Sequence, residues 1–248
     1  MNKNINYGLI VQARSSSSRL PGKVLMDIGG QPMLLRQIAR LKEGLGELPI
    51  VVATSTESSD DSIEELCQNN NIHCYRGSLD DVMFRFIQCA IEYKFDYVVR
   101  VGGDDPLIDP NCCSTLISMH QNKLYDFMYA SNREGWPYGC AAELISIDAL
   151  RNIHPKANSI FYKEHIIPYF FDHPEEFNIL KVKAPANINR PKFYFTVDFE
   201  EDLELIKRIF SLLKDEGDFF SLERVIHLID NHPEICNLNS HLHNGFDH

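Results

Sequence analysis

The sequence of 248 residues lacks several features that mark common functional classes. Its seven cysteines are irregularly spaced and form no C-x-x-C pair, which argues against a structural zinc site and fits reduced thiols in a cytoplasm. Acidic residues outnumber basic ones, and the net charge of -11 with a pI of about 5.3 argues against nucleic-acid binding. No apolar run approaches the ~20 residues of a membrane-spanning helix.

Residues 1–4 lead into an apolar run without the pattern of a signal peptide. The length and the 44% share of hydrophobic residues suit one large α/β domain with a substantial core. We therefore expect one cytoplasmic domain over residues 1–248, with no nucleic-acid partner and no membrane insertion.

The most informative stretch is the loop that follows the first apolar run, residues 9–11. Four serines at 15–18 lie between Arg14 and Arg19, and Pro21-Gly22 then turns the chain before Lys23. A loop with little side-chain bulk leaves backbone N–H groups free to face an anion, and three cations surround it. The pattern predicts a triphosphate cradle that is neither a Walker loop nor a G-x-G-x-x-G fingerprint. The alternative is an ordinary serine-rich surface loop.

Apolar runs alternate with amphipathic segments along the first half of the chain, which predicts a parallel sheet with helices on both faces. The expected strands are 9–11, 50–54, 72–75, 97–101, 127–130, 142–147 and 192–197. The expected helices begin near residues 32, 59, 78, 111, 160, 200 and 221. The tail from His241 to His248 is expected to fray.

Carboxylates follow two of the expected strands. The strand at 97–101 ends in Gly102-Gly103-Asp104-Asp105-Pro106, and the strand at 192–197 ends at Asp198. Open α/β sheets bind ligands at the carboxyl ends of their strands, and Mg²⁺ takes one or two carboxylates together with substrate phosphates. Asp104 and Asp105 are therefore candidate metal ligands, with Asp105 kept for a possible supporting role, and Asp198 is a further carboxylate at a strand end. The alternative for the first segment is a simple turn.

The alternation of apolar runs and amphipathic segments changes between residues 125 and 185. Two expected strands flank a connection at 133–139 that holds Trp136, the only tryptophan, and an aromatic segment follows at 160–171. The connection is either a rigid hairpin loop, a lid or a subunit contact. Most of the aromatic segment is expected in the core.

Four motifs then occur in order. They are Val-Gln-Ala-Arg-x4-Arg-Leu-Pro-Gly-Lys at 11–23, Arg-Gly-Ser-x2-Asp-Val at 76–82, Gly-Asp-x-Pro-Leu-Ile at 103–108, and Val-Asp-x3-Asp-Leu at 197–203. Together they resemble the cytidylyltransferase family that includes CMP-Kdo and CMP-sialic acid synthetases, and most of all the branch described as spore-coat polysaccharide synthesis proteins. The resemblance extends over residues 7–210 and includes the segment 162–165.

The resemblance implies a Rossmann-like nucleotidyltransferase fold, a three-layer α/β sandwich with a mostly parallel central sheet and a small inserted hairpin and helix arm. It implies transfer of CMP from CTP to a Kdo- or nonulosonate-like sugar acid for surface polysaccharide synthesis, with release of pyrophosphate and with Mg²⁺ as cofactor. It also implies a homodimer, with residues 125–185 serving substrate binding and dimer contact.

Residue roles follow by position in the motifs. The resemblance assigns catalysis to Arg14, Lys23 and Asp104, and metal binding to Asp104 and Asp198. The residues expected to bind the nucleotide are Gln12, Ala13, Arg14, Ser18, Arg19, Lys23, Ser78, Asp81 and Gly103. The residues expected to bind the acceptor are Tyr138, Glu143, Glu164 and His165.

One segment departs from the branch pattern and leaves the acceptor open. Where the branch reads Gly-Leu-Asp-Val-Glu, this chain reads Gly-Cys-Ala-Ala-Glu at 139–143, so Ala141 replaces an aspartate. Three alternatives to the CMP-sugar reaction therefore remain. They are another nucleoside triphosphate, a phosphorylated sugar or polyol that yields a CDP-linked product, and a nucleotide-sugar binding or regulatory protein without catalysis.

Overall fold

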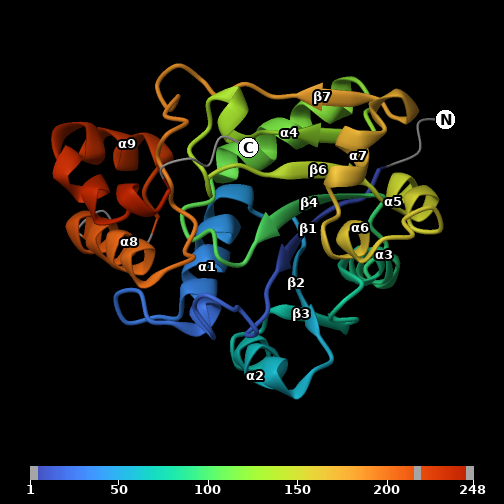
Figure 1. Cartoon of the computed structure of the whole chain (residues 1–248), viewed down its shortest axis with the longest axis horizontal. Helices are drawn as coiled ribbons and strands as arrows, with labels where there is room; N and C mark the ends of the chain where they lie inside the picture. Colours follow the sequence, from blue (N-terminus) through green and yellow to red (C-terminus); the bar gives the residue numbers. More distant parts are fainter. Residues whose placement is uncertain (1–4, 215–218, 244–248) are drawn as a thin grey trace.

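The computed structural model describes residues 5–214 and 219–243, and these form a seven-stranded sheet between helices (Figure 1). The strand order is β3-β2-β1-β4-β6-β5-β7. β6 runs antiparallel to both β4 and β5, and all other neighbouring strands are parallel. The strands are β1 Tyr7–Gln12, β2 Ile50–Ser55, β3 His73–Gly77, β4 Tyr97–Gly102, β5 Phe127–Tyr129, β6 Glu143–Ser146 and β7 Ile179–Lys181. The predicted α/β architecture with a mostly parallel sheet is confirmed.

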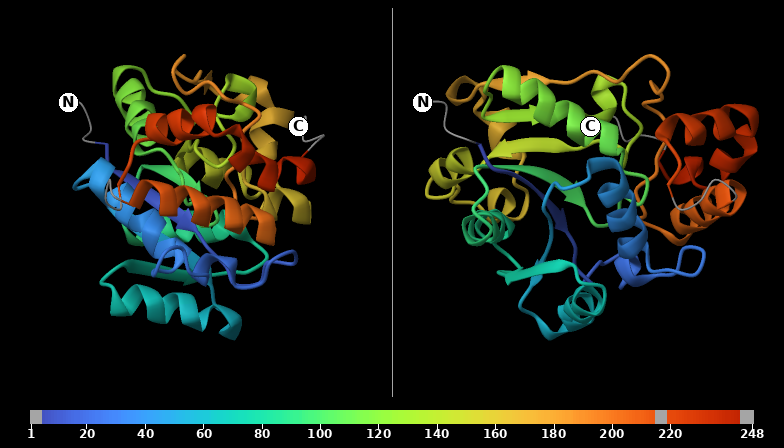
Figure 2. Two further views of the ribbon diagram at one scale, coloured as in Figure 1. Left: turned by 90° about the vertical axis from the view of Figure 1, so that its left-hand side faces the viewer. Right: turned by 180° about the vertical axis from the view of Figure 1, so that it is seen from behind.

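Helices cover both faces of the sheet (Figure 2). One core cluster joins the sheet to α1, α2, α4, α8 and α9, and a second joins its other face to α3, α5 and α7. The helix bounds are α1 Met33–Leu45, α2 Asp61–Asn69, α3 Val82–Glu92, α4 Pro110–Asn122, α5 Ile147–Ile153, α6 Ile160–Glu164, α7 Pro168–Asp172, α8 Glu200–Leu213 and α9 Leu222–Asn231.

Local sequence explains where several helices begin. The side chains of Asp81, Asp109 and Ser221 accept hydrogen bonds from backbone N–H groups in the first turns of α3, α4 and α9. Such caps satisfy donors that have no partner within the helix. In α1, Leu34, Ile38 and Leu41 recur at helical spacing and are buried in the core.

Two predictions of secondary structure are wrong. Residues 192–197 form no strand, because their ladder contact among the described residues is an isolated bridge between Tyr138 and Tyr194. The aromatic segment 160–171 is two short helices, α6 and α7, because the chain is extended at His165 and Pro168 starts a new turn. The edge strand β7 was not predicted.

The chain ends divide between described and undescribed residues. Residues 1–4 and 244–248 lie outside the described part. The prediction of no signal-peptide pattern at 1–4 and that of a frayed tail at 244–248 therefore fall outside it too. Within the described part, the expectation of a frayed tail is wrong for His243. Its side chain is only 6% exposed, its Nε2 lies 2.7 Å from Asp202 Oδ1, and its ring stacks on Tyr194 with centroids 3.5 Å apart. Hydrogen bonding and ring stacking therefore hold this part of the tail against the core.

All seven cysteines are free thiols, as expected from their irregular spacing. None of the helices in the described residues combines the length and apolarity that crossing a bilayer requires.

Candidate active site

The site lies where β1 and β4 end side by side in the middle of the sheet. The backbone N–H of Gly103 donates a 2.8 Å hydrogen bond to the carbonyl of Gln12. A Cβ on Gly103 would lie 2.9 Å from both the Ala13 Cβ and the Gln12 carbonyl oxygen, so the two segments can approach only because this residue is glycine. This contact brings the serine loop against the segment that carries Asp104.

The serine loop is held by a buried carboxylate that sequence analysis assigned only to a helix start. Asp60 Oδ1 accepts a 2.7 Å hydrogen bond from the backbone N–H of Ser15, and its Oδ2 accepts one of 3.2 Å from that of Ser55. Burial alone would raise the pKa of Asp60, but these hydrogen bonds outweigh it and lower the pKa below its ordinary value. Asp60 thus fixes the loop from beneath.

Lys23 lies between the two predicted metal ligands. Its Nζ is 2.6 Å from Asp104 Oδ2 and 3.0 Å from Asp198 Oδ1, and its side chain is almost fully buried. Burial alone would lower the pKa of Lys23, but the two carboxylates outweigh it and raise the pKa. For Asp198, the cations Lys23 and Arg19 together with a hydrogen bond from Tyr194 overcome burial and lower the pKa. Both partners are therefore charged at neutral pH.

Asp198 is positioned by a second set of polar groups from the C-terminal part of the chain. The Tyr194 hydroxyl donates a 2.7 Å hydrogen bond to Asp198 Oδ2, and the Asp198 backbone N–H donates to Asp202 Oδ2 at 2.9 Å. Asp202 Oδ1 in turn accepts from Asn239 at 2.8 Å and lies 2.7 Å from His243. Asp202 belongs to the motif at 197–203, but sequence analysis gave no role to Tyr194, Asn239 or His243. No local pattern links Asn239 and His243 to Asp202, which is far from both in the chain.

Asp105, the residue after Asp104, has a hydrogen-bond partner of its own. It accepts a 2.6 Å hydrogen bond from the Thr196 hydroxyl, and burial together with the adjacent Asp104 raises its pKa to about 8. Asp105 is therefore largely protonated at neutral pH. The supporting role expected for Asp105 stays a prediction.

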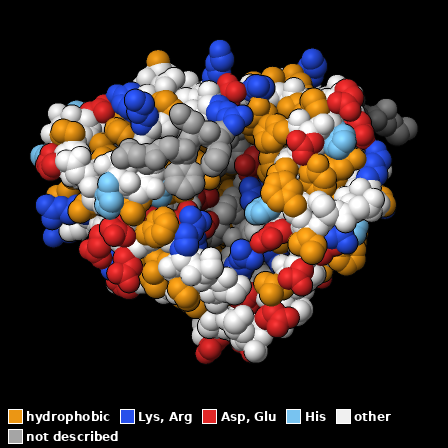
Figure 3. Space-filling view, viewed as in Figure 1, with side chains coloured by type: hydrophobic (Ala, Val, Ile, Leu, Met, Phe, Trp, Pro, Cys, Tyr) orange, Lys and Arg blue, Asp and Glu red, His pale blue; other side chains and the backbone are white. Residues whose placement is uncertain are grey.

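Two cavities meet at these carboxylates. The loop-side cavity has a volume of about 240 Å³ and is lined by Gln12, Arg14, Ser17, Ser18, Arg19, Lys23, Val24, Arg100, Gly102, Asp104 and Asp198. The hairpin-side cavity, about 320 Å³, is lined by Arg19, Arg100, Gly102, Asp104, Asp105, Ala130, Ser131, Asn132, Pro137, Tyr138, Gly139, Ala141, Glu143, Thr196 and Asp198. Figure 3 shows charged side chains of both signs around the hollow near the middle of this face. The shared wall includes Asp104 and Asp198.

The predicted nucleotide residues are only partly brought together. Five of them line the loop-side cavity, and Ala13 packs against Gly103. Ser78 and Asp81 line neither cavity. Asp81 instead caps α3 through the Phe84 N–H and lies 2.9 Å from His154 Nε2, while Ser78 accepts from the Asp81 N–H. The five are Gln12, Arg14, Ser18, Arg19 and Lys23, and the predicted metal ligand Asp104 lines the same cavity.

The predicted acceptor residues divide in the same way. Tyr138 and Glu143 line the hairpin-side cavity. Glu164 lies outside it, with an oxygen 3.6 Å from Arg14 Nη2, and the His165 ring packs on Phe161. The roles of all these residues stay predictions.

Arg100 lines both cavities and was not predicted as a site residue. Its signal in the sequence is a single cation inside the apolar run 97–101. On β4 it lies opposite Glu143 of β6, and its Nη1 is 3.1 Å from Glu143 Oε2.

The residues Asp104 and Asp198 fit a hard divalent cation. An oxygen of each carboxylate lies within 3.0 Å of the same cationic nitrogen, so the two side chains converge on one point. Oxygen ligands of this kind suit Mg²⁺.

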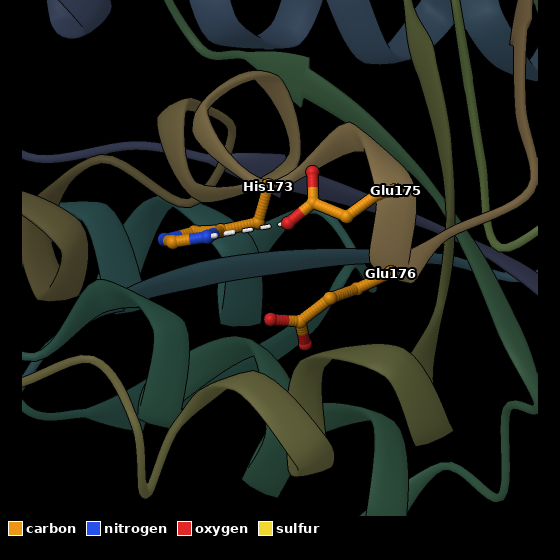
Figure 4. Close-up of side chains that lie close together, drawn as sticks. All are labelled: His173, Glu175 and Glu176. Carbon is orange, nitrogen blue, oxygen red and sulfur yellow. Dashed lines mark ion pairs between the residues drawn. The ribbon is translucent and has the colours of Figure 1, made fainter.

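A second group of possible ligands is found on the surface, where His173, Glu175 and Glu176 lie close together (Figure 4). Glu176 is already paired with Lys156 at 2.6 Å, and the group lines neither cavity. It carries no functional assignment.

Residues 9–227 match the profile of a family described as Cytidylyltransferase. The chain belongs to this family. Cytidylyltransferases are nucleotidyltransferases, so the enzyme class expected from the motifs is confirmed. Among the relatives, the spore coat polysaccharide biosynthesis protein SpsF of Bacillus subtilis is 31% identical over 232 residues, which cover 91% of this chain and 94% of SpsF.

Solved cytidylyltransferase structures share the fold. A cytidylyltransferase from Leptospira borgpetersenii superposes with a TM-score of 0.89 at 28% identity, covering 94% of this chain and 97% of that one. A CMP-2-keto-3-deoxy-manno-octonic acid synthetase, solved in complex with CTP, superposes with a TM-score of 0.64 at 19% identity, covering 84% and 99%. The second likeness concerns the fold alone.

Proposed function

We propose that this cytidylyltransferase transfers CMP from CTP to a hydroxyl group of a sugar acid of the Kdo or nonulosonate type and releases pyrophosphate. The product would serve surface polysaccharide synthesis. The observation that carries the proposal is the cluster of Lys23 with Asp104 and Asp198, because these two carboxylates line both cavities. Two substrates bound on either side of this wall would meet at the cluster.

In this proposal the loop-side cavity takes the triphosphate. CTP brings about four negative charges, and Arg14, Arg19 and Lys23 line the cavity together with the serine hydroxyls of residues 17 and 18. Charge-assisted hydrogen bonds from such groups stabilise both the bound triphosphate and the departing pyrophosphate. The fold of a synthetase solved with CTP and the family assignment support this nucleotide.

The acceptor occupies the hairpin-side cavity. Tyr138 offers an aromatic face there, and Glu143 offers a carboxylate to a sugar hydroxyl. Asp104 and Asp198 would hold Mg²⁺, which supplies charge neutralisation at the phosphate oxygens and lowers the pKa of an attacking hydroxyl. Phosphoryl-type transfer is catalysed mainly by positioning and electrostatic stabilisation. A covalent enzyme intermediate is therefore not required.

We also propose a homodimer and a cytoplasmic location. Three exposed apolar side chains belong to α6 and α7, where Ile160, Phe161 and Phe171 are 76%, 55% and 48% exposed. Exposed groups of this size support a contact with a second subunit. Free thiols are kept reduced in a cytoplasm, where CTP is also available.

The nucleotide half of the proposal is tested by thermal unfolding with CTP, UTP, GTP or ATP in the presence of Mg²⁺. A ligand that binds only the folded state stabilises it by RT ln(1 + [L]/Kd), which is ~2.7 kcal/mol at a hundredfold excess over Kd. We expect a large shift with CTP alone, followed by pyrophosphate release when a sugar acid is added. A shift with another nucleotide would replace CTP, and no shift at all would favour a protein without catalysis.

A further inference from the structure

Arg100 stands at the partition between the nucleotide and acceptor halves of the site. It belongs to β4, in the middle of the sheet, and lines both the loop-side and the hairpin-side cavity. Because Arg100 belongs to a central strand, its backbone is held more rigidly than the loop that carries Arg14, Arg19 and Lys23. A cation in this place can reach a group that lies next to the reacting atoms.

The guanidinium of Arg100 has hydrogen-bonding capacity to spare. Its Nη1 is 3.1 Å from Glu143 Oε2, its Nη2 donates a long hydrogen bond of 3.4 Å to Gln12 Oε1, and its buried Nε has no partner among the described residues. An arginine carries five N–H donors in a fixed planar fork that matches a carboxylate. One N–H of Nη1 and one of Nη2 thus remain for a ligand, while the buried Nε lies behind them.

The other cations around the two cavities have different neighbours. Lys23 is bound between Asp104 and Asp198, and Arg19 Nη2 is 3.0 Å from Asp198 Oδ1. Arg14 lines only the loop-side cavity. Arg19 and Arg100 are the two cations among the described residues that line the hairpin-side cavity, and Arg19 comes from the serine loop. Arg100 is therefore the cation best placed for the acceptor.

The chemistry of a 2-keto sugar acid fits this position. In such a sugar the carbon that carries the attacking anomeric hydroxyl also carries the carboxylate. A hydroxyl placed at the wall between the cavities therefore brings its carboxylate to the same wall. There the acid needs a cation that is not already used by the triphosphate.

We infer that Arg100 receives the acceptor carboxylate next to the attacking hydroxyl and so selects sugar acids over uncharged sugars. Glu143 holds the guanidinium before the acceptor arrives and yields part of it to the incoming carboxylate. This inference rests on the proposed function and specifies its acceptor. It also gives a reason why Glu143 remains in a segment where Ala141 replaces the branch aspartate.

The test compares a sugar acid with its own methyl ester. Wild-type protein, Arg100→Gln and Arg100→Lys are assayed for pyrophosphate release with CTP, Mg²⁺ and a panel of eight- and nine-carbon 2-keto-3-deoxy sugar acids or their esters. We expect wild type to prefer the acid, and Arg100→Gln to lose about 100-fold in kcat/KM for the acid but little for the ester, because charge-assisted bidentate bonds are lost. Arg100→Lys should recover part of the preference.

Two controls separate this role from others. Arg151→Gln removes an exposed arginine of α5 and should leave the acid-to-ester ratio unchanged. Glu143→Gln should raise the acceptor KM while retaining the preference for the acid. Thermal stabilisation by CTP is measured for wild type and for Arg100→Gln, so that any loss of nucleotide binding is separated from a change in the acid-to-ester ratio.

Three results would overturn the inference. The first is an unchanged acid-to-ester ratio in Arg100→Gln, and the second is a fall in kcat with both acceptors, which would place Arg100 on the α-phosphate instead. The third is a wild-type protein that is stabilised by CTP but uses none of the acids. A wild-type protein that is not stabilised by CTP would overturn the proposed function itself.

Discussion

The Lys23 ammonium lies 2.6 Å from Oδ2 of Asp104, and the same nitrogen lies 3.0 Å from Oδ1 of Asp198. One buried cation thus neutralises the two carboxylates that are proposed to bind Mg²⁺. Lys23 and the metal would compete for the same carboxylate oxygens. The Lys23 ammonium must therefore move away from them when metal and triphosphate bind. This gives Lys23 two separable effects, one on turnover and one on metal affinity.

Replacing Lys23 by Met should abolish most turnover while tightening metal binding in the absence of nucleotide. Turnover should fall ~100-fold or more, because a charged group near the departing phosphate is lost. Metal affinity should rise, because no cation then competes for Asp104 and Asp198. Steady-state pyrophosphate release and calorimetric titration with Mg²⁺ measure the two effects.

The matched lysine control is Lys156→Met, which removes an exposed ion pair with Glu176 and should change neither quantity. Asp104→Asn should lose both turnover and metal affinity. Near-native turnover in either site variant would remove that residue from the proposed mechanism.

Replacing Tyr194 by Phe should weaken metal binding without unfolding the protein. The hydroxyl donates to Asp198 Oδ2 at 2.7 Å, and loss of such a supporting bond typically reduces metal affinity ~10- to 100-fold. The ring stack with Tyr138 and His243 can remain, since only the oxygen is removed. Titration with Mg²⁺ should show the change, whereas Tyr93→Phe, on the opposite side of the sheet, should not. Equal affinities in the two variants would contradict a positioning role for Tyr194.

Sequence analysis located Lys23, Asp104 and Asp198 because each follows an apolar run within a short motif. It did not find Asp60 or the tail residue His243, whose partners Ser15 and Asp202 come from distant parts of the chain. It also missed Tyr194, although its partner Asp198 is close in the sequence. Contacts of this kind depend on how the elements pack, which no local pattern specifies. The segment 192–197 shows the opposite error, since its alternating apolar residues resemble a strand but no neighbouring strand pairs with it.

Folding stability should depend on pH through Asp109, the N-cap of α4. Burial raises the pKa of this carboxyl to about 6 from an ordinary 3.8, and hydrogen bonds from Asn111 and Cys112 oppose the shift only in part. Because the folded pKa lies above the unfolded one, this group's contribution is fully present below about pH 3.8 and is lost as the pH rises through about 6. Asp109→Asn keeps an oxygen for capping but cannot ionise.

The variant Asp109→Asn should therefore gain stability relative to wild type as the pH is raised from 4 to 8. Thermal melts across this interval measure the difference. Asp148→Asn, an exposed aspartate of α5 with a side chain 84% accessible, serves as the control and should follow wild type. A constant difference between Asp109→Asn and wild type at every pH would show that Asp109 does not titrate in this range.

Replacing Gly103 by Ala should impair nucleotide binding more than it impairs folding. The added Cβ would lie 2.9 Å from the Ala13 Cβ and from the Gln12 carbonyl oxygen, so the ends of β1 and β4 must move apart. Overpacking of this kind costs ~1–3 kcal/mol. The displacement falls on the serine loop and on Asp104, which follow these two strands. Ala13→Gly removes one of the two contacts. The double variant Gly103→Ala with Ala13→Gly should therefore recover part of the thermal stabilisation by CTP. Equal losses of this stabilisation in the single variant Gly103→Ala and in the double variant would show that the contact with Ala13 is irrelevant.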